Sequence, residues 1–333
     1  MRSRTAFRAV SAALLVVVVA ALWGTHQDAA HAFWKTLAGL PVPAILGALV
    51  LILVQVNAQG LRLWAILPRE TSLSAGRVVG AFTAGEWANI FTPARAGDAL
   101  KVVLMSRLPG ARRISVLQAT GAVVADKIID IGSLALLCAI AGLLGLVWTG
   151  VGPRLPALPL AAVAGGMLVL MLVGLRLAPA KWFGGWRAAG RELLRGLSAL
   201  KDPVRCAASL ALSSGAWIAE LLAARVLCAG LGFPLSLPQA LFAIAILNVG
   251  ILVPVVVANA GMYEAAFAYG LSRSGVPVPS AIAIAAAHHV LELLGLSLSA
   301  AAFALAFHAP PWLHLPLFRR RTPCASSIPS ARS

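Results

Sequence analysis

Apolar stretches long enough to cross a bilayer recur along the whole chain, and they limit its fold more than any other feature. They lie near residues 7–24, 41–67, 115–149, 155–176, 204–232, 236–258 and 279–308. A helix needs about 20 predominantly apolar residues to span the hydrocarbon core. The chain is 60% hydrophobic and only 11% charged, whereas a soluble protein carries about 25% charged residues. The sequence therefore predicts a membrane protein.

The same windows predict an all-α fold. Lipid tolerates only helices and closed barrels, because every backbone polar group must be satisfied internally, and the windows lack the alternation typical of strands. We expect a polytopic helical bundle of about seven or eight spans, with additional broken or re-entrant helices. One integral membrane domain is predicted over residues 1–310, followed by a basic, Pro- and Ser-rich cytoplasmic tail over 311–333.

The first apolar window admits two interpretations. Its basic start and the later "DAAHA" resemble a secretory signal peptide with a cleavage site of small residues. The alternative is an uncleaved first span over 7–24, which the immediate succession of further spans favours.

The net charge of +16 comes from basic residues in the connectors between apolar windows. Nucleic-acid-binding domains instead combine basic and aromatic residues on one folded face, so no nucleic-acid partner is predicted. The positive-inside rule places these connectors in the cytoplasm, with both termini there and segments 25–40 and 150–156 outside a bacterial inner membrane. The connectors carry Arg2, Arg4, Arg8, Arg62, Arg69, Arg77, Arg107, Arg112, Arg113, Arg319, Arg320, Arg321 and the dense group from Arg176 to Arg205.

Residues 181–201 belong to that dense group and mix Trp and Leu with basic residues at helical spacing. This pattern is typical of a helix that lies in the membrane interface on anionic lipid. The alternative is a basic loop that only sets the orientation of the chain.

The segment "GEWANIFTPARAGDALK" places four charges between apolar stretches. A charged residue costs about 2.5–3.5 kcal/mol at the centre of an inserted helix, so it usually faces a cavity or a partner. Pro93 should end the first helix, and Gly97 allows a turn. Asp98 would then begin the next helix and cap its free N–H groups, with Lys101 on the same face and Arg95 in the break.

Arg95 has two interpretations. A guanidinium suits phosphate oxygens, so it can bind an anionic lipid head group. Alternatively, it pairs with Glu86 or Asp98 and holds the break together without any ligand.

The second half of the chain repeats this arrangement. Pro254 and Gly261 follow Asn248 as Pro93 and Gly97 follow Asn89, and Glu264 falls in the first turn of the next predicted helix. Interrupted apolar segments at corresponding positions of two halves point to a transporter-like site between repeats, often of inverted topology.

Further ionisable residues lie inside apolar windows and are candidates for a proton or polar relay. His288 and His289 lie four and three residues before Glu292, and this spacing predicts a buried His–Glu hydrogen bond. The alternative interpretation is that these residues relay protons. Lys127 stands where it could neutralise one of two nearby aspartates. The relay candidates are Glu86, Asp126, Asp130, His288, His289 and Glu292.

Motifs of enzymes and metal sites are not found. The sequence has no nucleophile elbow, phosphate loop or dinucleotide fingerprint, and the two adjacent histidines have no third ligand at zinc-binding spacing. We therefore predict no enzyme activity, metal or cofactor.

Two motifs resemble the flippase-like membrane family that includes the transmembrane region of lysylphosphatidylglycerol synthases. "NIFTPARAGDALKVVLMSR" resembles its N…P-x-R-x-G-[ED] signature, and "NAGMYEAAFAYGLSRSGVPVPSAIAIAAAHHVLELLG" resembles its second, a G-x-x-E followed by a G-V loop and an Ala-rich span. The size without a synthase domain and the histidines in the last span are most similar to the stand-alone branch associated with hopanoid biosynthesis. The likeness covers roughly residues 10 to 308.

The resemblance implies a protein that translocates or exports a lipid, with membrane lipids as partners, either an anionic phospholipid or a hopanoid-type lipid. The chain departs from the family's usual pattern at two positions. Asp98 stands where the family more usually has Glu, and Lys101 stands where Arg is common. Lysyl transfer is not predicted, because the resemblance includes no aminoacyl-transfer domain. The residues that fall on the two signatures are Asn89, Pro93, Arg95, Gly97, Asp98, Gly261 and Glu264.

The leading hypothesis is that the two broken elements meet inside the bundle and form a polar groove for a lipid head group. The predicted head-group residues are Asn89, Arg95, Asp98, Lys101 and Glu264, and the predicted structural breaks are Pro93, Gly97, Pro254 and Gly261. Two alternatives stay open: a membrane-embedded lipid transferase with Asp126, Asp130 or Glu292 as base, and a non-catalytic membrane scaffold.

Overall fold

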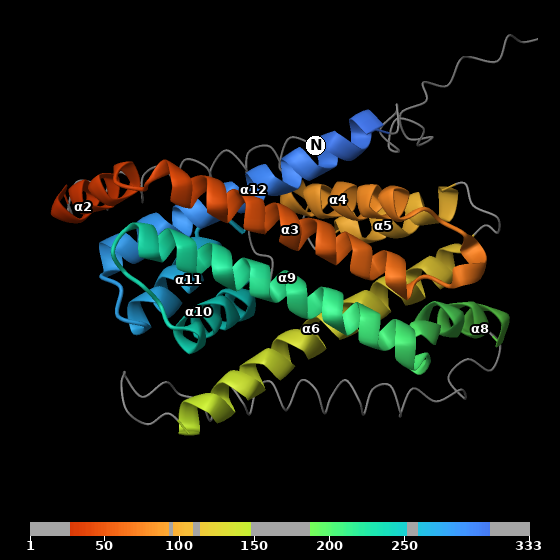
Figure 1. Cartoon of the computed structure of the whole chain (residues 1–333). Helices are drawn as coiled ribbons and strands as arrows, with labels where there is room; N and C mark the ends of the chain where they lie inside the picture. The colour runs from red at the N-terminus through yellow and green to blue at the C-terminus, as the bar shows by residue number, and fades with distance from the viewer. Residues whose placement is uncertain (1–26, 93–95, 109–113, 148–186, 252–258, 307–333) are drawn as a thin grey trace, which may run out of the picture.

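A computed structural model describes residues 27–92, 96–108, 114–147, 187–251 and 259–306 (Figure 1). Its regular elements, over these residues, are all helical, which confirms the predicted all-α fold. Within the described ranges, three helices are long and apolar enough to cross a membrane: α3 (Val42–Ile66), α9 (Pro203–Gly230) and α12 (Val278–Ala306). The predicted windows 7–24 and 155–176 and the tail 311–333 lie outside the described residues.

Of the other described α-helices, two lie within the remaining apolar windows, near 115–149 and 236–258, and the rest lie outside the windows. The predicted window 115–149 contains α6 (Val116–Val147). Within the basic segment 181–201, the described residues form α8 (Arg187–Gly196) and the short η4 (Leu197–Lys201). The remaining elements are α2 (Gln27–Ala38), η1 (Arg69–Thr71), α4 (Ala75–Phe91), α5 (Ala96–Arg107), α10 (Leu237–Gly250) and α11 (Met262–Arg273).

One end of the bundle, here called the basic end, collects the basic connectors. Arg205 at the start of α9 donates to the carbonyl of Ile66 at the end of α3, so these two helices run antiparallel. Ser115, next to the start of α6, donates to Glu192 of α8 (3.0 Å). Among the described residues, the predicted connectors that carry Arg69, Arg77, Arg107 and the basic residues from Arg187 to Arg205 thus lie at one end of the bundle.

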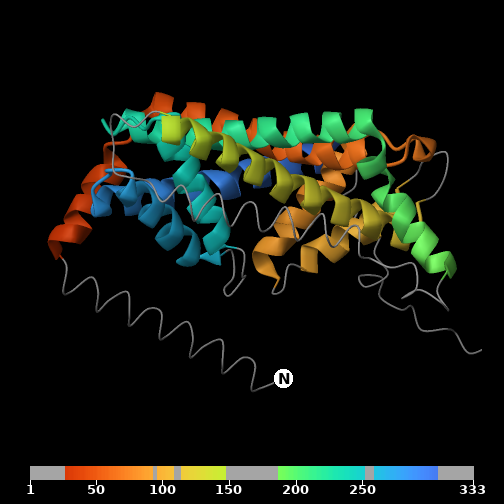
Figure 2. The same cartoon turned by 90° about the horizontal axis from the view of Figure 1, so that it is seen from below.

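The opposite end holds the start of α3 and of α12. Thr36 of α2 lies 3.3 Å from Ser280 of α12, oxygen to oxygen, and Gln239 near the start of α10 donates to the carbonyl of Ser274 just after α11 (3.1 Å). The pair α10–α11 is therefore a hairpin that starts from and returns to the opposite end, whereas α4–α5 starts from and returns to the basic end (Figures 1 and 2).

The two halves of the bundle consequently have inverted topology. A long helix, a two-helix hairpin and a second long helix follow each other as α3, α4–α5 and α6, and again as α9, α10–α11 and α12. Neither hairpin crosses from one end to the other, so each is re-entrant. The inverted repeat that the sequence motifs predict is present in the described residues.

Outward faces of the long helices are apolar. On α3, Val42, Leu46, Val50 and Val54 are four residues apart and each is more than half exposed, so they form one stripe along the helix. Soluble monomers rarely expose such a continuous apolar face. The stripe fits a surface solvated by lipid.

Candidate functional site

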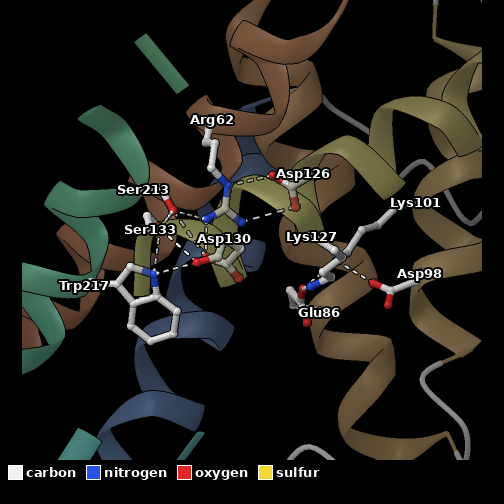
Figure 3. Close-up of polar contacts among 10 residues, drawn as sticks. All are labelled: Arg62, Glu86, Asp98, Lys101, Asp126, Lys127, Asp130, Ser133, Ser213 and Trp217. Carbon is white, nitrogen blue, oxygen red and sulfur yellow. Dashed lines mark hydrogen bonds and ion pairs between the residues drawn. The ribbon is translucent and has the colours of Figure 1, made fainter. Parts of the chain in front are cut away.

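Five polar side chains, here called the hairpin cluster, gather beside the break between α4 and α5: Glu86, Asn89, Asp98, Lys101 and Lys127. The Lys101 ammonium donates to Glu86 and, over 2.8 Å, to Asp98 (Figure 3). Lys127 of α6 lies 3.4 Å from the same Glu86 oxygen. The Asn89 amide donates to Glu86 (3.1 Å) and Asp98 (3.4 Å). Two carboxylates and two ammonium groups thus neutralise each other inside the bundle.

The local sequence explains this geometry. The first helix ends at Phe91, and Thr92 has the extended backbone (φ −111°, ψ 135°) that a following proline imposes. The second helix begins at Ala96, which puts Asp98 in its first turn and Lys101 one turn later on the same face. These placements confirm the predicted break, whereas Pro93 and Arg95 themselves lie outside the described residues.

Gly97 has a different role from the one predicted. It lies inside α5 rather than in a turn, and a Cβ at this position would lie 1.9 Å from the Gly85 carbonyl oxygen and 2.5 Å from Asn89 Oδ1. The absence of a side chain lets α4 and α5 approach closely enough for the hairpin cluster to form. The interpretation of Gly97 as a turn residue is therefore wrong.

A second set of polar groups, the arginine network, lies between α3, α6 and α9 (Figure 3). The fully buried Arg62 donates through Nε to Asp126 Oδ1 (2.7 Å) and through Nη2 to Asp126 Oδ2 (3.2 Å). It also donates to Asp130 and to Ser213 (2.8 Å). Trp217 adds an N–H donor to Ser133 (3.1 Å). Both aspartates are thereby held by one guanidinium.

The arginine network corrects two predictions. Arg62 is not a connector residue on the cytoplasmic side, because α3 continues to Ile66 and carries Arg62 into the bundle. The cation that contacts the two aspartates is Arg62, whereas Lys127 contacts Glu86 of α4.

In the second half, the break between α10 and α11 has its own polar contacts. Gly261 has a positive φ of 83° that suits glycine, and its N–H donates to Glu264 (2.7 Å). Glu264 lies in the first turn of α11, as predicted. Glu264 also lies 2.7 Å from His289 Nδ1 of α12. The hydroxyl of Tyr263 lies 2.8 Å from His288 Nδ1. Pro254 lies outside the described residues.

The predicted hydrogen bond between a histidine and Glu292 is wrong. Both histidines bind residues of α11 instead, because their Nδ1 atoms face that helix rather than the next turn of their own.

The predicted head-group residues fall into two groups rather than one. Asn89, Asp98 and Lys101 belong to the hairpin cluster, whereas Glu264 belongs with His289 of α12. The long helices separate the hairpins: α12 packs against α4 and α11, and α6 packs against α5 and α10.

Glu220 was expected from the sequence to find a partner on another element, but its partner Gln55 and the buried Ser213 and Trp217 were not predicted. Gln55 of α3 donates to Glu220 of α9 (3.0 Å), and each is only 5% exposed. Ser213, Trp217 and Glu220 share one face of α9, at spacings of four and three residues. That spacing was a signal that the sequence offered.

The fold and these sites define a polytopic α-helical membrane protein of two inverted halves, with charged residues at the break of each hairpin. A family model described as the lysylphosphatidylglycerol synthase TM region matches residues 10–300. Because this match covers most of the chain, the chain belongs to that family, as the two motifs predict. No curated protein and no solved structure matches it significantly. Its narrower likeness to the hopanoid-associated branch stays a prediction.

Proposed function

We propose that the protein binds the head group of a membrane lipid at the hairpin cluster and moves the lipid between leaflets without changing it chemically. The observation that supports this proposal is that charged groups at the hairpin break are partly exposed rather than fully buried. The side chains of Lys127, Asp98 and Glu86 are 30%, 26% and 19% exposed, although the cluster lies on an inner face of the bundle. Irregular backbone and charge at such a place usually line a polar cavity.

The charges favour an anionic head group. Two lysines balance two carboxylates within the hairpin cluster, and the sequence places Arg95 directly before α5, where it adds a positive charge. The start of α5 adds the partial positive charge of a helix N-terminus. Asn89 Oδ1 is buried without a hydrogen-bond partner among the described residues, so it can accept a hydrogen bond from a hydroxyl or amine of the head group.

The inverted hairpins support movement rather than simple storage. Paired interrupted segments related by inverted topology are the architecture in which one site opens alternately to the two sides of a membrane. The lipid tails would stay against the apolar outer faces while the head group passes the two breaks. The positive-inside rule places the basic end on the cytoplasmic side of the membrane.

Mass spectrometry of lipids retained by the gently purified protein tests the proposal. We expect one anionic lipid class to be enriched over the bulk membrane, and Arg95→Ala to lose this enrichment. Arg107→Ala is the matched control, because Arg107 is exposed at the far end of α5. Equal stability of the two variants in detergent would show that binding, not folding, has changed.

Proteoliposomes then test movement. A fluorescent analogue of the enriched lipid should become accessible to a membrane-impermeant quencher faster with wild type and Arg107→Ala than with Arg95→Ala. Retention of bulk lipid alone, unchanged by Arg95→Ala, would refute head-group binding and favour a scaffold. A retained lipid whose mass shifts on incubation would refute transport without chemistry and favour a transferase.

A further inference from the structure

The basic helix α8 has no role in the proposed function, although it is built firmly into the bundle. A Cβ at Gly196 of α8 would lie 2.2 Å from the carbonyl oxygen of Gln118 in α6. A Cβ at Gly121 of α6 would lie 2.2 Å from the carbonyl oxygen of Leu193 in α8. Backbones this close leave no room for side chains between them, so α8 packs on α6 in one orientation.

A hydrogen bond also ties α8 to the first turn of α6. Ser115 accepts from the backbone N–H of Gln118 (3.1 Å) and so caps α6. Its hydroxyl donates to Glu192 of α8 (3.0 Å). The following η4 is anchored as well, since Ala199 is fully buried. The side of α8 that faces away from α6 is therefore fixed by the fold.

Leu194 and Arg195 lie on the outer side of α8. Leu194 is two residues from both Glu192 and Gly196, so it lies on the side of the helix away from α6. It is 52% exposed, and the side chain of Arg195 next to it is 55% exposed. Arg195 contacts Glu192, but a guanidinium has more N–H donors than one carboxylate can accept. Donors are thus left for a further anion.

The sequence adds positive charge around these two residues. Arg187 and Arg191 precede Leu194 by seven and three residues, so they stand on the same side of the helix. Lys201 at the end of η4 is exposed. From 187 to 201 the chain has four basic residues and one acidic residue. An exposed leucine among an excess of arginines is typical of a helix that lies in the membrane interface on anionic lipid.

The position of α8 in the bundle fits that interface. α9 begins at Pro203, directly after η4, and Arg205 at its start donates to the carbonyl of Ile66 at the end of α3. Both candidate spans therefore end at this level. Trp64 is 43% exposed there, and its indole N–H donates to the carbonyl of Leu73 (2.8 Å), as expected of a tryptophan at a membrane boundary. In Figure 2, α8 is inclined steeply to α9 rather than continuing it.

We propose that the outer side of α8 binds the head groups of anionic phospholipids at the membrane surface. Leu194 enters the boundary between head groups and acyl chains, and Arg195 contacts phosphate oxygens from the same side. The occupant is the bilayer rather than nucleic acid or a soluble acidic protein, because the exposed leucine and the level of α8 both fit a lipid boundary. This surface is separate from the hairpin cluster and does not depend on the proposed function.

Contact between Leu194 and labelled lipids tests this surface. In a cysteine-free protein that carries Leu194→Cys, a bimane fluorophore reports quenching by phospholipids with a nitroxide just below the head group. In vesicles of mixed phosphatidylcholine and phosphatidylglycerol, we expect labelled phosphatidylglycerol to quench more strongly. One basic residue near an anionic surface corresponds to about a fivefold preference, so Arg195→Gln should lower the preference about fivefold. Glutamine at 187, 191 and 195 together should abolish it, and high salt should weaken it.

Two controls show that an altered preference belongs to α8. Arg107→Gln removes an exposed charge from the end of α5 and should leave the preference at Leu194 unchanged. Val290 in the middle of α12 is 62% exposed, so a bimane at Val290→Cys should be quenched equally by both labelled lipids. Equal quenching there in every variant shows that the protein is folded and inserted.

The possible results separate three conclusions. Absence of quenching at Leu194 by either lipid would overturn contact with the membrane and favour a soluble partner or a helix that only sets orientation. Equal quenching by both lipids, or a preference that survives all three glutamines, would overturn head-group binding. Arg95→Ala should not change the preference at Leu194, so failure of this surface and failure of the hairpin cluster are distinguishable.

Discussion

Replacing Arg62 by methionine removes the cation that contacts both Asp126 and Asp130. Arg62 is fully buried and makes two bonds to Asp126, of 2.7 and 3.2 Å, in addition to its contacts with Asp130 and Ser213. Removing one partner of a buried ion pair costs about 3–5 kcal/mol, because it leaves an uncompensated charge. Asp130 is 18% exposed and can recover some solvation, so we expect a loss of about 3 kcal/mol in the free energy of unfolding.

Detergent-induced unfolding in mixed micelles can measure this loss. Cys228 is fully buried, so its reaction with a thiol-specific dye reports unfolding in a background that lacks the other cysteines. Neutralising the aspartates together, as Asp126→Asn and Asp130→Asn, should restore more than half of the stability lost by Arg62→Met, because no charge is then left unpaired. A loss below about 1 kcal/mol, or equal losses with and without the asparagines, would refute the assignment of Arg62.

Two further predictions concern packing and orientation. Gly97→Ala should destabilise the protein by about 1–3 kcal/mol, since its Cβ would clash with the Gly85 carbonyl. The control is Gly215→Ala in α9, whose Cβ meets nothing within 4 Å and which should be neutral or stabilising. The same unfolding assay compares the two variants. In a cysteine-free background, Lys35→Cys should react with an impermeant maleimide on intact cells, and Arg107→Cys only after the membrane is opened. The reverse labelling would show that the basic end is outside.

The positions of the long helices could be predicted from the sequence to within a few residues. The window 41–67 became α3 (Val42–Ile66), because apolar length alone decides whether a segment is helical in lipid. The break between α4 and α5 was predictable for a similar reason, since Pro93 acts on its own neighbour. Both inferences need information from a few adjacent residues only.

Partners across helices could not be predicted in this way. Arg62 stands near the end of an apolar window, where an arginine usually marks a connector, and its partners Asp126 and Asp130 are 64 and 68 residues away. His289 has Glu292 three residues further along its own helix, but it contacts Glu264 on α11. In both cases the rotation of a helix about its axis decides the partner, and hydrophobic windows say little about rotation in a chain that is apolar on most faces.

The two hairpins have the same topology but different chemistry, and this difference bears on how the molecule can move. Asp98 and Glu264 occupy equivalent first turns, yet Asp98 is neutralised by Lys101 of its own hairpin, whereas Glu264 is tied to His289 of α12. Movement of α4–α5 would carry Asp98 and Lys101 together and break the contact of Glu86 with Lys127. Movement of α10–α11 would separate Glu264 from His289 and Tyr263 from His288. The second hairpin is therefore held to α12 through its first-turn residues, whereas the first hairpin neutralises its first-turn charge within itself.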